Sequence, residues 1–160
     1  MGNDEIIIVF GGAGGLGSAI AEFYGEKGLQ VIVADIDRKN GKALEQKNKK
    51  ILYEYVDTTS YESVVSLYGK IKNKFGYLTH IVSLAGLASI EEFEGIKKLT
   101  PETMEKSIRL NLTSHMFVVK EGIGLLEKCG HPNLSVTLIS SVNALKGFGL
   151  PVYSGAKAGL

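Results

Sequence analysis

Short, continuous runs of apolar residues recur along the chain, and most of them end at a glycine or an acidic residue. The first run is Ile-Ile-Ile-Val-Phe at 6–10, and Gly11 ends it. Similar runs follow at 30–34, 51–56, 79–84 and 134–140. Runs of this length that are rich in β-branched residues are typical of strands buried on both faces of a parallel sheet. The sequence therefore predicts five strands.

Helical patterns separate these runs. Two of them cover about residues 15–27 and 38–48, and a third begins at Ser60, whose hydroxyl can cap a helix. The Tyr68 hydroxyl is expected to reach the rim of the core. The inward face of the third helix is predicted to hold Val64, Leu67, Tyr68, Ile71 and Phe75.

A polar loop at 88–99 precedes a long helix. Its predicted start is Thr100-Pro101-Glu102, which places a cap, a proline in the first turn and an acid near the positive end of the helix dipole. Gly130 ends this helix, and one more helix begins at Val152. The inward stripe of the long helix is predicted to be Ile108, Leu112, Met116, Val119, Ile123 and Leu126.

Alternating strands and helices predict an α/β fold. Strands buried on both faces need helices on both sides of the sheet, joined by right-handed crossovers. We expect a doubly wound parallel sheet with strand order 3-2-1-4-5, in a single domain over residues 1–160.

Composition and charge exclude several classes of protein. The 160 residues hold 18 basic and 17 acidic side chains, a net charge of +1, which argues against a broad basic surface for nucleic acids. Asp4 and Glu5 stand where a targeting segment needs basic residues, and the run at 6–10 is too short to span a membrane. A single cysteine, Cys129, fits a reducing compartment. We expect a cytoplasmic protein with no nucleic-acid, membrane or metal partner.

A glycine-rich loop joins the first strand to the first helix. Three spacings fit it: Gly12, Gly14 and Gly17; Gly11, Gly14 and Gly17; or Gly11, Gly15 and Gly17. Glycines allow a tight turn and a close approach to a pyrophosphate, and the helix N-terminus offers free N–H groups. No Lys-Ser or Lys-Thr follows the loop, which argues against an ATPase.

Asp35 closes the second strand, 18 residues after Gly17. A carboxylate there can accept both hydroxyls of the adenosine ribose and repels a 2′-phosphate, so NAD is favoured over NADP. Arg38 and Lys39 favour NADP instead, because a nearby cation can hold its 2′-phosphate, unless both residues belong to a solvated first helical turn. Asp57 ends the third strand and either meets the adenine edge or serves as a turn residue.

Four polar residues suggest proton-transfer chemistry. Tyr153 and Lys157 are four apart on a predicted helix and so share one face. An ammonium near a phenol favours the phenolate, which can exchange a proton with an alcohol near neutral pH. Ser141 follows the fifth strand and can orient a carbonyl oxygen, while Asn111 can anchor a water that links Lys157 to solvent.

Together these motifs resemble the short-chain dehydrogenase/reductase family, which has the Rossmann fold, over essentially all 160 residues. The step of 12 residues from Ser141 to Tyr153 resembles the classical branch and matches Ser141 better than Ser140. The resemblance implies hydride transfer between NAD and a secondary alcohol or ketone, a homo-oligomer, and a tetrad of Asn111, Ser141, Tyr153 and Lys157. It implies an NAD site formed by Gly11, Gly14, Gly15, Leu16, Gly17, Asp35, Ile36, Asp57, Thr58, Ala85, Gly86, Tyr153 and Lys157.

The chain departs from the family pattern in two motifs and in length. Phe10 replaces the threonine before the first glycine, and Ser83-Leu84-Ala85-Gly86 replaces an Asn-Asn-Ala-Gly turn, which is expected to weaken loop hydrogen bonds. Family members continue well past the Tyr–Lys helix, so we expect an N-terminal part of a longer enzyme that lacks the C-terminal strands. Two alternatives remain: a dinucleotide-binding fragment or sensor without activity, and a structural role in which the strand at 134–140 pairs with a partner.

Overall fold

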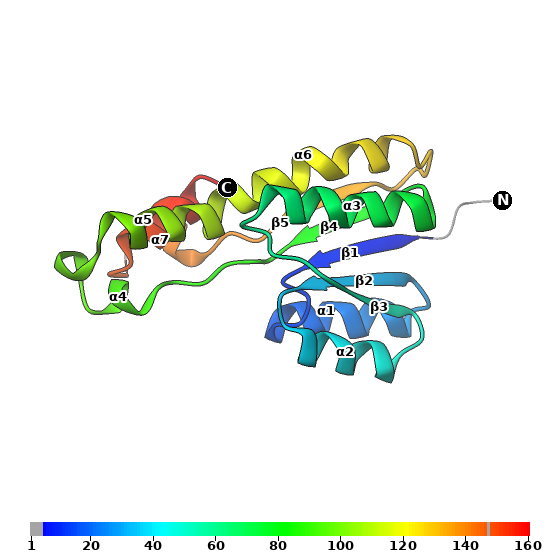
Figure 1. The fold of residues 1–160 in the computed structure, drawn as a ribbon, viewed down its shortest axis with the longest axis horizontal. Helices are drawn as coiled ribbons and strands as arrows, with labels where there is room; N and C mark the ends of the chain where they lie inside the picture. The colour runs from blue at the N-terminus through cyan, green and yellow to red at the C-terminus, as the bar shows by residue number, and fades with distance from the viewer. Residues whose placement is uncertain (1–4, 147) are drawn as a thin grey trace.

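Five parallel strands form one sheet in the computed structural model, which describes residues 5–146 and 148–160 (Figure 1). Asp4, part of the acidic start noted above, lies outside the described residues. The strands stand in the order β3-β2-β1-β4-β5, which confirms the predicted doubly wound sheet. They are β1 (Ile6–Phe10), β2 (Gln30–Asp35), β3 (Ile51–Tyr55), β4 (His80–Ser83) and β5 (Ser135–Leu138).

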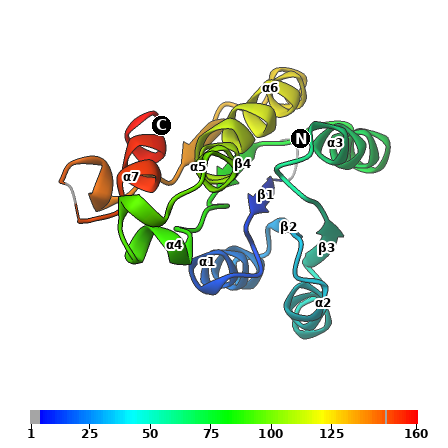
Figure 2. The same ribbon diagram turned by 60° about the vertical axis from the view of Figure 1, so that its left-hand side comes forward.

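Helices cover both faces of the sheet. Figures 1 and 2 show α1 and α2 on one face and α3 and α6 on the other. These helices are α1 (Gly15–Glu26), α2 (Arg38–Lys47), α3 (Tyr61–Phe75) and α6 (Ser114–Glu127).

The central strand β1 shows why the apolar runs are continuous. Ile8 and Phe10 belong to the core between the sheet and helices α3 and α6, whereas Ile7 and Val9 belong to the core on the α1 and α2 side. Successive side chains of a strand point to opposite faces, so a strand between two layers of helices needs apolar residues at every position.

Helix α3 begins as predicted, but its Tyr68 hydroxyl does not lie where the sequence predicts. The Ser60 side chain caps the helix by accepting a hydrogen bond from the Ser63 N–H, at 3.2 Å. The Tyr68 hydroxyl donates to the Val118 carbonyl in α6, at 2.9 Å, and the residue is 5% exposed. The expectation that this hydroxyl reaches the rim is wrong, because α6 packs against α3 and covers it.

The long helix runs without a break through α5 (Pro101–Ile108), the π-helical turn η2 (Arg109–Thr113) and α6. Its predicted inward stripe is largely wrong: Ile108, Met116 and Ile123 are 42–44% exposed, although Leu126 is buried. The first half of this helix passes the loops after the strands, where exposed backbone groups need polar partners. The buried polar residues there are Ser107, Asn111, Ser114 and His115.

Further short elements gather beyond the carboxyl ends of the strands. The predicted polar loop at 88–99 contains α4 (Ile90–Phe93) and η1 (Ile96–Lys98). After β5 come η3 (Val142–Ala144) and α7 (Pro151–Ala158). In Figure 1, α4, α5 and α7 lie together on the left, at the edge of the sheet to which the β1 arrow points. Ligands bind at this edge in doubly wound sheets.

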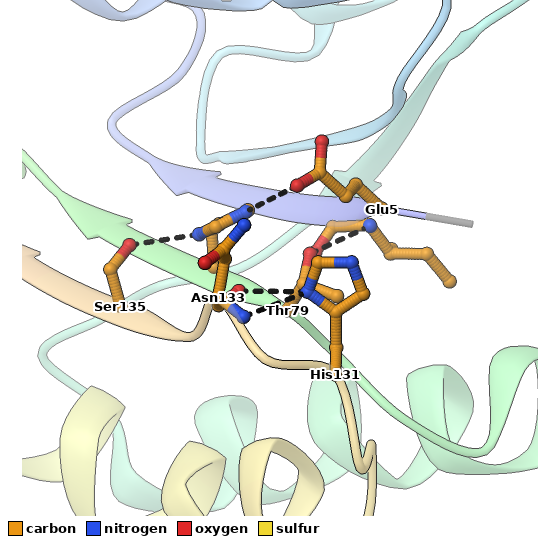
Figure 3. A network of polar contacts seen from close by, with 7 residues as sticks. Glu5, Thr79, His131, Asn133 and Ser135 are labelled. Atoms are coloured by element: carbon orange, nitrogen blue, oxygen red, sulfur yellow. Dashed lines mark hydrogen bonds and ion pairs between the residues drawn. The ribbon is translucent and has the colours of Figure 1, made fainter. Parts of the chain in front are cut away.

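A separate polar network occupies the amino ends of the strands (Figure 3). The His80 ring joins two strands to the chain start: Nδ1 lies 2.9 Å from the Ser135 hydroxyl and Nε2 lies 3.7 Å from a Glu5 carboxylate oxygen. Nearby, the Thr79 hydroxyl accepts a hydrogen bond from the Ile6 N–H, at 2.9 Å. These contacts tie strand ends together, away from the edge where ligands bind.

Within residues 5–146 and 148–160, no helix has both the length and the apolar character needed to cross a membrane. The same part of the chain contains no group of three or more histidine, cysteine, aspartate or glutamate side chains arranged for a metal ion.

Candidate active site

The glycine loop between β1 and α1 is held by backbone contacts. The Gly11 N–H donates to the Ala34 carbonyl, at 2.9 Å, so the loop crosses to the end of β2. A Cβ at Gly17 would overlap the Gly11 carbonyl oxygen, and only glycine allows this close approach. Gly14 precedes α1 without a side-chain cap, and the first turn carries no acidic residue. The free N–H groups of this helix end therefore suit an anion such as a pyrophosphate.

The loop forms one wall of a cleft of about 510 Å³ at the carboxyl ends of the strands. Eleven of the predicted cofactor residues line it: Gly11, Gly14, Gly15, Leu16, Gly17, Asp35, Ile36, Asp57, Thr58, Ala85 and Gly86. The remaining lining residues carried no chemical signal in the sequence: Ala34, Val56, Thr59, Leu84, Leu87 and Leu110.

Asp35 fixes the shape of this cleft as well as lining it. One carboxylate oxygen accepts a hydrogen bond from the Ala13 N–H of the glycine loop and the other from the Asp37 N–H, both at 2.9 Å. Each carboxylate oxygen can accept more than one hydrogen bond, so ribose hydroxyls can still bind. The Arg38 guanidinium stacks over the Tyr55 ring, 4.1 Å from its centroid, which gives this cation a partner within the chain.

Asp57 serves as a turn residue. Its carboxylate accepts hydrogen bonds from the N–H and the hydroxyl of Thr59, at 2.9 and 2.7 Å, and its own N–H donates to the Ser63 hydroxyl. It also lines the cleft, so the alternative expectation of contact with adenine stays a prediction.

The cleft fits a dinucleotide in its chemistry. The glycine loop offers N–H donors for phosphates, and Asp35 offers a carboxylate for ribose hydroxyls. Its volume falls within the usual range of ligand sites, about 300–1,000 Å³.

Gly86 is where the cleft meets the predicted catalytic residues. A Cβ at this position would lie 2.7 Å from the Asn111 side-chain oxygen and 3.1 Å from Lys157 Nζ. Asn111 and Lys157 are 0% and 3% exposed. Both side chains therefore stand directly behind the wall of the cleft, and the close packing requires a glycine in front of them.

Asn111 fastens the loop after β4 to the long helix. Its side-chain oxygen accepts from the Leu87 N–H, and its amide nitrogen donates to the Leu87 and Ser107 carbonyls, each at 2.9 Å. Asn111 lies inside the π-helical turn η2, a feature that is frequent at functional sites. The loop that was expected to be weakly bonded is thus held from the helix.

The Lys157 ammonium is buried among uncharged hydrogen-bond partners. Its Nζ donates to the Ile139 carbonyl, at 2.9 Å, and lies 3.4 Å from His115 Nε2. Burial lowers the pKa of the Lys157 ammonium from its usual value. His115 also places Nδ1 2.7 Å from the Ser83 hydroxyl.

The two serines after β5 have separate partners. The Ser141 hydroxyl accepts a hydrogen bond from the Asn143 N–H, at 3.2 Å, and begins η3. The Ser140 hydroxyl instead donates to the Lys157 carbonyl, at 2.5 Å, and so holds α7 against the strand end. Tyr153 lies one turn before Lys157 on α7 and is half-buried. The catalytic assignment of Ser141 stays a prediction.

No sequence motif pointed to one buried acid, Glu92. It lies in α4 among acidic neighbours that are exposed, yet it is 0% exposed itself. One carboxylate oxygen accepts from the Val152 and Tyr153 N–H groups, each at 3.0 Å, and the other accepts from the Ser107 hydroxyl, at 3.0 Å. A carboxylate at a helix N-terminus is stabilising, so Glu92 caps α7 from 60 residues away.

Comparisons with known proteins agree with this geometry. The family model described as short chain dehydrogenase matches residues 5–160. The L-fucose dehydrogenase of Oryctolagus cuniculus is 27% identical over 98% of this chain, and the acetoacetyl-CoA reductase of Synechocystis is 31% identical over 98% of it. A crystal structure described as gox2181 shares the fold with a TM-score of 0.89 at 21% identity, over 98% of this chain and 62% of that chain.

The chain spans 55% and 61% of the lengths of these two relatives. Within that span, the family match extends over the glycine loop, the strand ends and the helix that carries Tyr153 and Lys157. The chain therefore belongs to the short-chain dehydrogenase/reductase family.

Proposed function

We propose that the full-length protein is an NAD-dependent oxidoreductase that interconverts a secondary alcohol and a ketone. One observation carries the proposal: Lys157 and Asn111 stand behind the Gly86 wall of a cleft lined by eleven predicted cofactor residues. Relatives named as dehydrogenases and reductases support it. In this proposal, residues 1–160 form one NAD-binding domain of the protein.

The first half of the chain would hold the cofactor. The N–H groups at the start of α1 bind the pyrophosphate, and Asp35 accepts the adenosine ribose hydroxyls. Asp35 also favours NAD over NADP, because its negative charge opposes a 2′-phosphate. When bound, the nicotinamide supplies the site that accepts or donates a hydride.

The second half would move the proton. The Tyr153 hydroxyl exchanges a proton with the substrate oxygen, which the Ser141 hydroxyl orients. Lys157 favours the phenolate of Tyr153 and donates to the nicotinamide ribose. Asn111 holds the loop in front of Lys157 and supports a water link to solvent.

The test is binding and turnover by the full-length protein. We expect tighter binding of NADH than of NADPH by fluorescence titration, and oxidation of some secondary alcohol in a broad panel. Tyr153→Phe should lower kcat by about 100-fold or more while NADH still binds. Tyr24→Phe, which removes a hydroxyl from α1, is the matched control.

Each outcome separates the candidate functions. Unchanged activity of Tyr153→Phe at saturating NADH would refute the role of Tyr153. Binding of NADH without turnover of any ketone in the panel would favour a dinucleotide-binding protein without activity. No binding of either dinucleotide would overturn both.

The exposed stripe of the long helix supports a homo-oligomer. Ile108, Met116 and Ile123 are 42–44% exposed along α5 and α6, and exposed apolar residues grouped on one face mark association sites. Met116→Lys should then shift the full-length protein to a smaller assembly in sedimentation experiments. We also place the protein in the cytoplasm, on the sequence grounds given above.

A further inference from the structure

His115 connects three elements behind the cleft. It lies in the first turn of α6 and is 0% exposed. Its Nδ1 lies 2.7 Å from the hydroxyl of Ser83, the last residue of β4, and its Nε2 lies 3.4 Å from Lys157 Nζ in α7. No part of the proposed chemistry so far uses this imidazole.

The polar partners of the two ring nitrogens favour one tautomer of His115. A lysine ammonium has three donors and no acceptor, so the His115 nitrogen that faces Lys157 must accept. The imidazole proton then sits on Nδ1 and is donated to the Ser83 hydroxyl. Burial, together with the Lys157 charge, lowers the pKa of His115 to about 4, whereas a backbone hydrogen bond at Ala85 opposes the shift. The ring is therefore neutral near pH 7.

The other groups around the Lys157 ammonium are uncharged or take part in the proposed reaction. Nζ meets the Ile139 carbonyl from the segment after β5 and the His115 ring from α6. The titratable neighbour on α7 itself is Tyr153, one turn before Lys157. A buried ammonium with uncharged partners depends on each acceptor that it has.

We propose that His115 is a positioning residue for Lys157: a neutral, Nδ1-protonated imidazole whose Nε2 lone pair accepts a hydrogen bond from the lysine ammonium. Two of the three Lys157 donors are then fixed, by Ile139 and His115, and the third is left for the cofactor ribose. This inference rests on the proposed role of Lys157. The same imidazole is a hydrogen-bond partner on the long helix for Ser83, which stands where the family turn has asparagine.

The tautomer can be measured directly on the unaltered full-length protein. Two-bond ¹H–¹⁵N correlation spectra of ¹⁵N-histidine-labelled protein distinguish the two neutral tautomers and the cation. We expect His115 to carry its proton on Nδ1 and to remain neutral at pH 6. A proton on Nε2, or a cationic ring at that pH, would overturn the proposal. This readout needs neither substrate nor cofactor.

Variants then test whether the acceptor matters for the cofactor. His115→Leu removes the lone pair, and NADH should bind about tenfold more weakly by fluorescence titration. His115→Gln keeps an acceptor near the Nε2 position and should stay within about threefold of the unaltered protein. His131→Leu, in the loop before β5, is the matched control and should not change the affinity.

The outcomes separate this inference from the proposed function. Equal NADH affinity in the unaltered protein and a folded His115→Leu variant overturns the positioning role. Equal losses in His115→Leu and His115→Gln overturn it too, because a packing defect would then explain both. If the unaltered protein binds no NADH, the proposed function fails, and the tautomer alone decides whether His115 accepts from Lys157.

Discussion

The cofactor cleft lies next to a cluster of buried polar side chains formed by Lys157, Asn111, His115 and Glu92. The two regions differ in whether backbone or side-chain groups form them. Backbone dominates the cleft: glycine N–H groups, a helix end and strand termini, with Asp35 and Asp57 bracing the turns. Buried side chains dominate the cluster, where Asn111, His115 and Glu92 each join segments far apart in the sequence. The first region depends on local sequence and the second on the packing of several elements, so the two should respond differently to substitution.

The largest effect is expected from Gly17→Ala in the cleft. The added methyl group overlaps the Gly11 carbonyl oxygen, so the turn must move. We expect a loss of about 3 kcal/mol in unfolding free energy and of detectable NADH binding, from urea unfolding and fluorescence titration.

Gly69→Ala is the matched control, because a Cβ there meets nothing within 4 Å on the outer face of α3. It should raise the stability slightly, since alanine is the better helix former. If Gly17→Ala bound NADH normally, NADH binding would not depend on the backbone geometry of this turn.

Next in size is Glu92→Ala in the cluster. Removing this carboxylate leaves the Val152 and Tyr153 N–H groups and the Ser107 hydroxyl without their acceptor. We expect a loss of about 2–3 kcal/mol in unfolding free energy, together with reduced turnover, because α7 frays at the end that carries Tyr153. The exposed neighbour substitution Glu91→Ala should cost less than about 0.5 kcal/mol. Equal stability of the two variants would mean that Glu92 does not cap α7.

A pH dependence should follow from His115. Its pKa falls from 6.5 to about 4 on folding, so the unfolded chain binds the proton more readily. The stabilisation is fully present above pH 6.5 and is lost as the pH falls toward 4, at most about 3 kcal/mol over that interval. Chemical unfolding across this range measures it. His115→Leu should flatten the dependence, and an unchanged slope in this variant would contradict the assignment.

The smallest effect is expected from Arg38→Ala at the start of α2. Its guanidinium stacks on Tyr55, an exposed contact that contributes about 0.5–1 kcal/mol. NADH affinity should change less than about threefold. A large loss confined to NADPH binding would instead show that Arg38 holds a 2′-phosphate and would reverse the expected preference for NAD.

The sequence by itself determined the sheet and the cleft. Each strand lies within a short apolar run, and the order was predicted from the doubly wound class of fold. The prediction of burial on both faces is wrong for β5, which is largely exposed at the edge of the sheet. The cleft residues follow the carboxyl ends of those strands, so knowing where each strand ends was enough to place Gly11, Asp35 and Gly86 around one cavity. Only their contacts within the chain, such as the Asp35 bond to Ala13, were not visible in the sequence.

Tertiary structure alone decided which side chains are buried beyond the strand ends. Glu92 and His115 have the polarity of surface residues, and the apolar stripe with Ile108 and Met116 follows a helical period, so local pattern predicts the reverse of what is found. The physical reason is that a helix passing a bundle of loops must satisfy their backbone groups rather than bury hydrocarbon. Whether a polar residue meets such a partner depends on elements up to 61 positions away, which no local spacing records.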